Sequence, residues 1–402
     1  MNFFESRAVA IAIRLVLAGL CCLGIWFSWE LVRADVLFQR DTPDSIRAAI
    51  RLAPDNSGYY MRLAQLDEQN ARSLLEAALL HNPYNAQANI ELGLSFEADG
   101  DNDRAEQLLL KAFSVDHTFL PRWTLANFYF RRDNMPKFWE WAQKSAQMPS
   151  DDVGPLFELC WRATHDAGTI TNTILNNSRN LTLIRQYIYF LRTKNQLSAA
   201  GSVSERLVQY GDPEADSSGM LDLVNKLIES NQTAEAESLW SGLIEKQWVT
   251  AELTPPNNPA FARDPIPVRF DWALISSQEV RAVPGPTGLH VEFSGGQPET
   301  CSLADQAVVL KPGKYTVNFA YRSSDIAPDS GVHWEMVDAK SNTAIATSSD
   351  LSSESMQQSS FSFLVKPDSP LLYLRLAYQR PAGTERTAGT LIVQSIEIAP
   401  EH

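Results

Sequence analysis

The chain has 402 residues, too many for a single hydrophobic core, so its length predicts two or three domains. Its formal net charge of −14 argues against a nucleic-acid-binding protein, because phosphate contacts need clustered lysine and arginine. The four cysteines, at positions 21, 22, 160 and 301, form neither a disulfide framework nor a CxxC metal site.

Residues 1–35 are predicted to be a membrane anchor. The run from Ala8 to Trp29 is apolar apart from Arg14 and is about long enough to cross a bilayer as a helix. The positive-inside rule places residues 1–7, which include Arg7, in the cytoplasm. The far end carries the aromatic residues expected at a membrane interface, Trp26, Phe27 and Trp29. The rest of the chain is therefore expected outside the cytoplasm.

Two other interpretations of this segment stay open. Val32-Arg33-Ala34 offers a signal-peptidase site that would be cut before Asp35. The sequence before Cys21 misses a lipoprotein motif by one position.

Residues 41–250 are predicted to form a helical repeat domain. Apolar residues recur at three- and four-residue spacing between stop signals such as Pro54 and Asn82-Pro83. The pattern also repeats every 34 residues, as in Ala78, Ala112 and Ala146. A fixed interval of this size is typical of a helical solenoid, whose stacked units usually bind a partner.

These residues resemble the tetratricopeptide repeat (TPR). Leu92-Gly93 and Phe96 match its first helix, and Ala105 and Ala112 match the small residues of its second helix. The next copy departs from the pattern at Trp139, where a small residue is usual. The resemblance implies an α-solenoid that binds a protein.

A proline- and asparagine-rich break, Thr254 to Pro259, precedes a change of period from helical spacing to two. Alternating runs begin with VRFDWAL and continue through KYTVNFAYRS and VHWEM to LLYLRLAY and TLIVQSIEI. Strands without intervening helices predict an antiparallel β-sandwich over residues 260–400. The fold class is thus a multidomain protein, α then β.

The stretch VVLKPGKYTVNFAYRS and the final strand LIVQSIEI resemble the galactose-binding-like jelly roll of many non-catalytic carbohydrate-binding modules. Alternation predicts that a set of polar residues shares the face opposite the core, where they could hydrogen-bond sugar hydroxyls or simply form a solvated surface. The candidate glycan-binding residues are Arg322, His333, Glu335, Tyr373 and Arg375.

A second candidate site is a groove along the first helices of the repeats. Their exposed sides are expected to present an apolar area and two arginines able to grip a carboxylate of an extended peptide. The residues are Leu94, Glu97, Thr124, Phe128, Arg131 and Arg132.

The sequence contains no HExxH, GxSxG, P-loop or GxGxxG motif, so we expect no enzymatic activity, no metal and no cofactor. Carboxylate pairs could still be drawn from Glu292, Glu335, Asp338 and Glu397.

We therefore expect a single-pass scaffold of the bacterial inner membrane, with its bulk in the periplasm. The repeats would bind a protein of an envelope complex, and the sandwich would contact a polysaccharide during exopolysaccharide or surface-glycan assembly or export. A glycan-active enzyme and a structural oligomeric component of the envelope are the alternatives.

Overall fold

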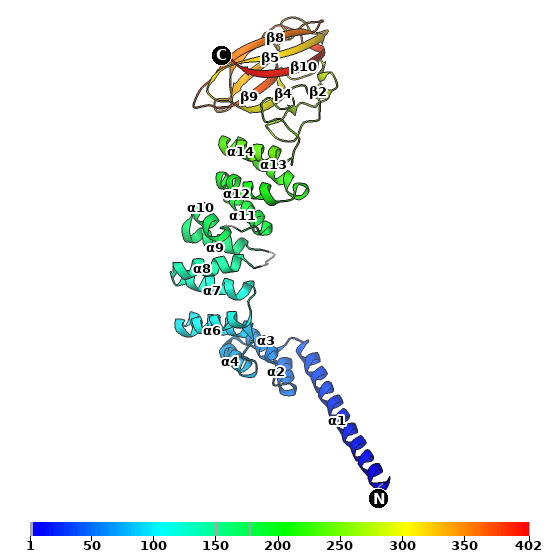
Figure 1. The fold of residues 1–402 in the computed structure, drawn as a ribbon, viewed down its shortest axis with the longest axis vertical. Helices are drawn as coiled ribbons and strands as arrows, with labels where there is room; N and C mark the ends of the chain where they lie inside the picture. Colours follow the sequence, from blue (N-terminus) through cyan, green and yellow to red (C-terminus); the bar gives the residue numbers. More distant parts are fainter. Residues whose placement is uncertain (1–2, 149–151, 177, 402) are drawn as a thin grey trace. The chain divides into compact units, whose positions relative to one another are not determined.

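In the computed structural model the chain forms two compact units, Met1–Asn176 and Asn177–His402. The structure describes residues 3–148, 152–176 and 178–401, so Met1 and Asn2 of the segment expected in the cytoplasm lie outside the described residues, and the side chain of Arg7 is likewise not described. Figure 1 follows the chain from a long first helix through paired helices to a two-layered β domain. The fold is that of an α chain followed by an antiparallel β-sandwich.

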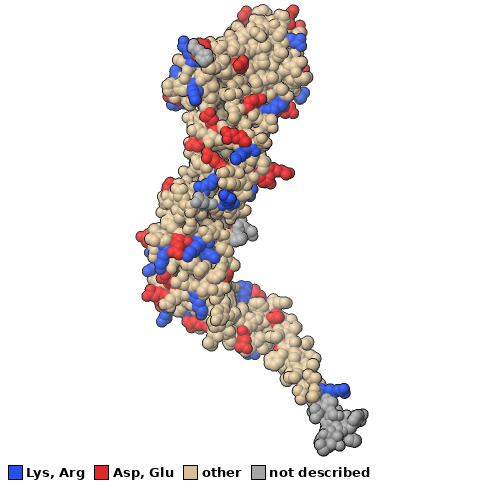
Figure 2. All heavy atoms as spheres, in the orientation of Figure 1, with Lys and Arg blue, Asp and Glu red and all other residues tan. Residues whose placement is uncertain are grey.

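Helix α1, Phe3–Phe38, begins the first unit. Its stretch Ile13–Phe38 is long and apolar enough to cross a membrane. Figure 2 shows almost no charged side chains on the part of this helix that is not drawn in grey. Trp26, Phe27 and Trp29 are all more than 60% exposed. An exposed apolar surface of this length is costly in water, so the helix fits a membrane anchor or a signal sequence.

The last turns of α1 belong to the core of the first helical hairpin. Ala34 is fully buried, and Leu37 and Phe38 pack with it against α2, Pro43–Leu52, and α3, Ser57–Leu66. The hydroxyl of Tyr59 on α3 donates a hydrogen bond to the carboxylate of Asp35 on α1. The apolar helix is therefore packed directly against the repeats.

Antiparallel helical hairpins follow, with α5 packed on α6 and α7 on α8. Turns within these hairpins need a left-handed backbone, supplied by Gly100 at φ 85° and Asp133 at φ 53°. The 34-residue alanines are almost completely buried where helices meet, which confirms a TPR-like packing role for them. The bounds are η1 Glu68–Asn70, α4 Ala71–His81, α5 Ala86–Ala98, α6 Asn102–Val115, α7 Phe119–Arg131, α8 Met135–Ala146, α9 Gly154–Thr164, α10 Ala167–Ile170 and η2 Thr171–Leu175.

The second unit starts with four more helices, paired in the same manner: α11 Leu181–Thr193, α12 Leu197–Tyr210, α13 Pro213–Glu229 and α14 Thr233–Glu245. The guanidinium of Arg185 on α11 donates two hydrogen bonds, of 2.7 and 2.9 Å, to the nearly buried carboxylate of Asp216 on α13. This bidentate pair joins successive hairpins.

Two five-stranded antiparallel sheets form the β-sandwich. The first, here called sheet A, has the strand order β1-β4-β9-β6-β7; the second, sheet B, has the order β2-β3-β10-β5-β8. The bounds are β1 Ala273–Leu274, β2 Val280–Gly285, β3 Gly288–Ser294, β4 Thr300–Val309, β5 Gly313–Ser324, β6 Val332–Asp338, β7 Thr343–Thr347, β8 Gln357–Val365, β9 Leu371–Gln379 and β10 Ala388–Pro400.

The sandwich core lies between the sheets, where alternate residues of each strand meet. Trp334 and Leu374 of sheet A and Val317 of sheet B have no exposed surface. Strand β8 shows the alternation clearly, since Phe361 and Phe363 are buried while Ser360, Ser362 and Leu364 are exposed. The period-two pattern of the sequence thus predicts the buried face correctly.

The segment from Val268 to Trp272 is not a strand, although its alternation favours one. Val268, Phe270 and Trp272 are buried as expected, but the regular ladder is limited to Ala273–Leu274. Polar contacts of the preceding loop hold this segment in irregular backbone, as described below.

Candidate functional site

A row of charged side chains crosses the outer face of sheet A. The antiparallel register aligns Asp305 of β4 with Arg375 of β9, and Arg375 with Glu335 of β6. Because their neighbours along each strand point into the core, these three side chains share the outward side. They come from three adjacent strands, so the sheet itself fixes their spacing.

The arginine lies between the two carboxylates. Its Nη1 donates a 3.1 Å hydrogen bond to Glu335 Oε1, whereas its Nε is 3.9 Å from Asp305 Oδ2. Arg269 approaches Asp305 from the other side, with 3.6 Å between its Nη1 and Asp305 Oδ1. Burial raises the pKa of the Asp305 carboxyl above its usual value, and the two arginines offset only part of this rise.

Two atoms of this row are buried without a hydrogen-bond partner among the described residues. They are Oδ1 of Asp305 and Nε of Arg375, one an acceptor and the other a donor. The ion-pair separations of 3.6 and 3.9 Å are too long for hydrogen bonds. Unsatisfied polar atoms of this kind are rare in folded proteins and indicate strain, bound water or a ligand.

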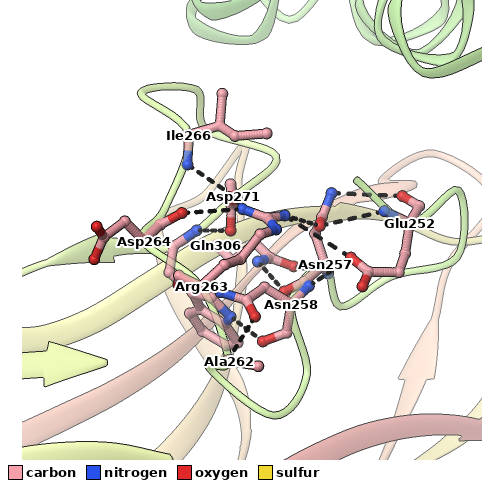
Figure 3. A network of polar contacts seen from close by, with 10 residues as sticks. Glu252, Asn257, Asn258, Ala262, Arg263, Asp264, Ile266, Asp271 and Gln306 are labelled. Atoms are coloured by element: carbon pink, nitrogen blue, oxygen red, sulfur yellow. Dashed lines mark hydrogen bonds and ion pairs between the residues drawn. The ribbon is translucent and has the colours of Figure 1, made fainter. Parts of the chain in front are cut away.

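The loop between α14 and β1, which carries Arg269, contains a network of polar contacts (Figure 3). Arg263 occupies its centre and donates hydrogen bonds of 2.5 Å to Asp271 Oδ2 and 2.6 Å to Asn257 Oδ1. Asp271 has no exposed surface and also accepts the backbone N–H groups of Ile266 and Trp272. The network fixes a loop that would otherwise have few regular hydrogen bonds.

Gln306 ties this network to the sheet. Its side-chain amide accepts from the backbone N–H of Asn257 at 2.6 Å and donates to the carbonyl of the same residue at 3.0 Å. The backbone carbonyl of Arg269 accepts from the N–H of Ala307 at 2.7 Å. Both contacts are made by the two residues that directly follow Asp305 on β4, so the loop is fixed to the strand that carries Asp305.

Helix α13 also contacts this loop. The side-chain amide of Asn225 accepts from the backbone N–H of Arg269 at 2.8 Å and donates to the carbonyl of Pro267 at 3.2 Å. Within this unit the helices thus help to set the position of Arg269.

Four of the five expected glycan-binding residues share sheet A. The register places Tyr373 opposite Val337 and His333 opposite Ala377, so both lie beside the charged row and are half-buried. Arg322 does not belong to this group, because it lies on β5 in sheet B. Alternation along a strand identifies the outward face but not which of two sheets carries it, and the expectation for Arg322 was wrong for that reason.

The expected groove on the repeats is largely closed at α7. Thr124 and Phe128 are 7% and 2% exposed, so they are core residues and the expectation of exposure was wrong. Leu94 remains partly exposed on α5, and Arg132 is exposed at the end of α7.

Arg131 is engaged with Glu97 instead of being free to bind a ligand. Its Nε and Nη2 donate hydrogen bonds of 2.8 and 2.6 Å to the two carboxylate oxygens of Glu97. A peptide carboxylate would have to displace this bidentate partner.

The carboxylates considered for catalysis are divided between the sheets. Glu335 and Asp338 lie on β6 in sheet A, whereas Glu292 and Glu397 lie on β3 and β10 in sheet B. Over residues 3–148, 152–176 and 178–401, no group of three or more His, Cys, Asp or Glu side chains is placed to hold a metal ion.

No protein-family model matches the sequence, and no curated protein matches it significantly. Solved structures do show likenesses. The chain is similar to the carbohydrate-binding module CBM4 at 16% identity, over 36% of this chain and 99% of that one, with a TM-score of 0.29. It is similar to Pseudomonas aeruginosa PilF at 16% identity, over 48% and 92% of the two chains, with a TM-score of 0.27. It is also similar to YrrB, a TPR protein with an unusual peptide-binding site, at 14% identity, over 51% of this chain and 94% of that one, with a TM-score of 0.25. At these values none of the likenesses extends to function.

Sequence reasoning missed Asp305 and the Arg263 network. The available signal was local: Asp305 is the one charged residue between Cys301 and Leu310, in a stretch otherwise suited to a buried strand. An isolated carboxylate in such a stretch needs a partner or a function. No spacing in the sequence could connect it to Arg269 or Arg375, because those contacts depend on strand order.

Proposed function

We propose that this protein is a non-catalytic, membrane-anchored scaffold on the outer side of a bacterial inner membrane. Its helical repeats hold a protein partner of an envelope complex, and its β-sandwich contacts a glycan. The process is the assembly or export of an exopolysaccharide or another surface glycan.

Retention of the anchor is supported by the packing of α1. Cleavage before Asp35 would remove Ala34, which is fully buried in the first hairpin, and would leave Asp35 at a new chain terminus. A signal peptide is normally separable from the fold that follows it, whereas this helix contributes core residues to it.

The glycan proposal rests on the unpartnered atoms of the charged row. A sugar hydroxyl both donates and accepts hydrogen bonds, so neighbouring hydroxyls could satisfy Asp305 Oδ1 and Arg375 Nε together. His333 and Glu335 supply further polar groups on the same face, and Tyr373 supplies an aromatic ring. Planar polar side chains beside an aromatic ring suit a carbohydrate better than an apolar ligand.

The proposal that the protein is non-catalytic is supported by the arginine partners of Glu335 and Asp305. Glu335 accepts a hydrogen bond from Arg375, and Asp305 lies between Arg269 and Arg375. Glycoside hydrolysis needs one carboxyl group that donates a proton and a second that acts as base or nucleophile. Two carboxylates that share one arginine are suited to holding a ligand.

Isothermal titration of the full chain in detergent, with neutral and uronic-acid-containing oligosaccharides, tests the glycan site. We expect Asp305→Asn to weaken binding at least tenfold. Glu292→Gln is the matched control, because Glu292 is an exposed carboxylate on the outer face of sheet B, and it should leave binding unchanged. An absence of heat with every oligosaccharide, or equal losses in both variants, would refute the site.

The enzyme alternative makes a different prediction for the same face. If the site hydrolysed glycans, the full chain would release reducing ends from a bound oligosaccharide, and Glu335→Gln would stop this release without preventing binding. Binding without product over many hours supports the scaffold.

A further inference from the structure

One side of the sandwich consists of two strands that each lack a second neighbour. Strand β7 is the last strand of sheet A and β8 is the last strand of sheet B, and the two lie next to each other. Among the described residues β7 pairs only with β6, and β8 pairs only with β5. Their outer edges therefore present unpaired backbone groups.

Neither strand carries the usual protection of an edge. β7 reads TAIAT and β8 reads QQSSFSFLV, so neither contains a charged residue or a proline. By contrast, the edge strand β2 on the other side of sheet B contains Arg281 and Pro284. Charges and prolines normally prevent a strand from pairing with another chain.

Exposed apolar side chains gather on this same side. Ile345 on β7, Leu364 on β8 and Met356 immediately before β8 are 40%, 55% and 47% exposed. Isolated exposed residues are ordinary, but three along two adjacent unpaired edges favour association.

Strand β8 is the better template of the two. Its nine residues pair with β5 without a register shift, whereas a shift interrupts the pairing of β7 at Ile345. A bulge twists an edge away from a partner, and a regular strand does not.

We propose that the free edge of β8 pairs antiparallel with β8 of a second copy of this chain, about a two-fold axis at Ser360. Sheet B then continues from one copy into the other. This interface is independent of the glycan site, which lies on sheet A.

The sequence around Ser360 is complementary to itself in this register. Met356 lies opposite Leu364 of the second copy, which covers two exposed apolar side chains, and Gln358 lies opposite Ser362. Glu354 lies in a bend just before β8 and Lys366 directly follows β8, so an antiparallel pair of these strands brings the two residues together at each of its ends. Both are exposed and have no ion-pair partner among the described residues. Ser360, Ser362 and Leu364 alternate with the buried Phe361, Phe363 and Val365 and share the outward face.

Self-complementarity decides between a second copy and an unrelated extended peptide. A two-fold interface brings the same residues together twice, so any mismatch would be repeated. Two copies of a chain with a net charge of −14 repel each other in general, yet this edge opposes Glu354 only to a lysine. Each two-fold pair of strands would carry that ion pair twice.

Disulfide formation in membranes tests the register. In the full chain with Cys21→Ser and Cys22→Ser, Ser360→Cys should form a covalent dimer on mild oxidation, because the two copies of residue 360 meet at the axis. Gln358→Cys is the matched control on the same strand and face, and it should give at least tenfold less dimer, since its mate is residue 362. Labelling with a maleimide shows that both cysteines are accessible.

A charge exchange provides the second measurement. Glu354→Lys should weaken dimerisation at least tenfold, as measured by light scattering of the full chain in detergent, and adding Lys366→Glu should restore it. If accessible cysteines at positions 360 and 358 give equal dimer or none, or if the charge exchange does not restore association, the proposal is wrong.

Discussion

Glu97 and Arg131 are 34 residues apart and form two hydrogen bonds between successive helical hairpins. They occupy the same position in two copies of the repeat, so the period of the sequence places them side by side. The 34-residue interval therefore aligns opposite charges as well as small packing residues.

Removing this pair should have a small effect. The Arg131 side chain is 46% exposed, and exposed ion pairs contribute about 0.2–1 kcal/mol. In a double-mutant cycle of Glu97→Gln and Arg131→Gln, thermal unfolding should show a coupling free energy in that range. A cycle that replaces Arg132 in place of Arg131 should show none; equal coupling in both cycles would mean that only net charge matters.

Gly93 should be sensitive to any larger side chain. A Cβ atom there would lie 3.1 Å from Leu109 Cδ2 and 3.3 Å from the carbonyl oxygen of Ala105, where α5 packs on α6. Gly93→Val should therefore lower the free energy of unfolding by about 1–3 kcal/mol. Gly219 in α13 has no atom within 4 Å of such a Cβ, so Gly219→Val should change stability little. Circular dichroism on heating distinguishes the two variants.

The first hairpin should lose stability at alkaline pH. Burial, together with the hydrogen bond to Asp35, raises the pKa of Tyr59 to about 12. Because the folded pKa lies above the unfolded value of about 10, the protonated hydroxyl stabilises the fold fully below pH 10 and this stabilisation is lost towards pH 12.

Denaturant titrations from pH 8 to 12 measure this loss. Tyr59→Phe should flatten the profile above pH 10, whereas Tyr84→Phe, at a residue that is 76% exposed, should leave it unchanged. An unaltered profile in Tyr59→Phe would contradict the assignment.

The loop network should depend on Arg263. Arg263→Ala leaves the fully buried Asp271 carboxylate without its cation, and breaking a buried pair costs about 3–5 kcal/mol. The free energy of unfolding in guanidinium chloride, followed by tryptophan fluorescence, should fall by that amount. Arg281→Ala, at an exposed position of β2, serves as the control and should shift it by less than about 0.5 kcal/mol.

The repeating helices and the alternating strands could be predicted from the sequence because both depend on local periodicity. Ala78 and Ala112 are buried where the 34-residue pattern requires. The pattern predicts Phe128 on the exposed side of α7, but the side chain is only 2% exposed, and the repeat pattern of one unit contains no information on what packs against it. Val268 and Phe270 alternate as a strand would, yet the contacts of Arg263 and Asn225 hold that segment in a loop.

The charged row could be predicted only in part. Alternation places Glu335 and Arg375 on the outward side of their strands, and the register confirms that they are neighbours. The third member, Asp305, comes from a strand about 30 residues earlier than β6, and only the order β4-β9-β6 brings it beside Arg375. Strand order is set by packing of the whole sandwich, which no short motif encodes.

The packing of Ala34 and Phe38 into the first hairpin leaves no flexible joint between that hairpin and the apolar part of α1. An α-helix turns by about 100° per residue, so one residue inserted between Trp29 and Ala34 would swing the hairpin to a different side of the helix axis. The side of α1 on which the first hairpin lies is thus set by the phase of one continuous helix.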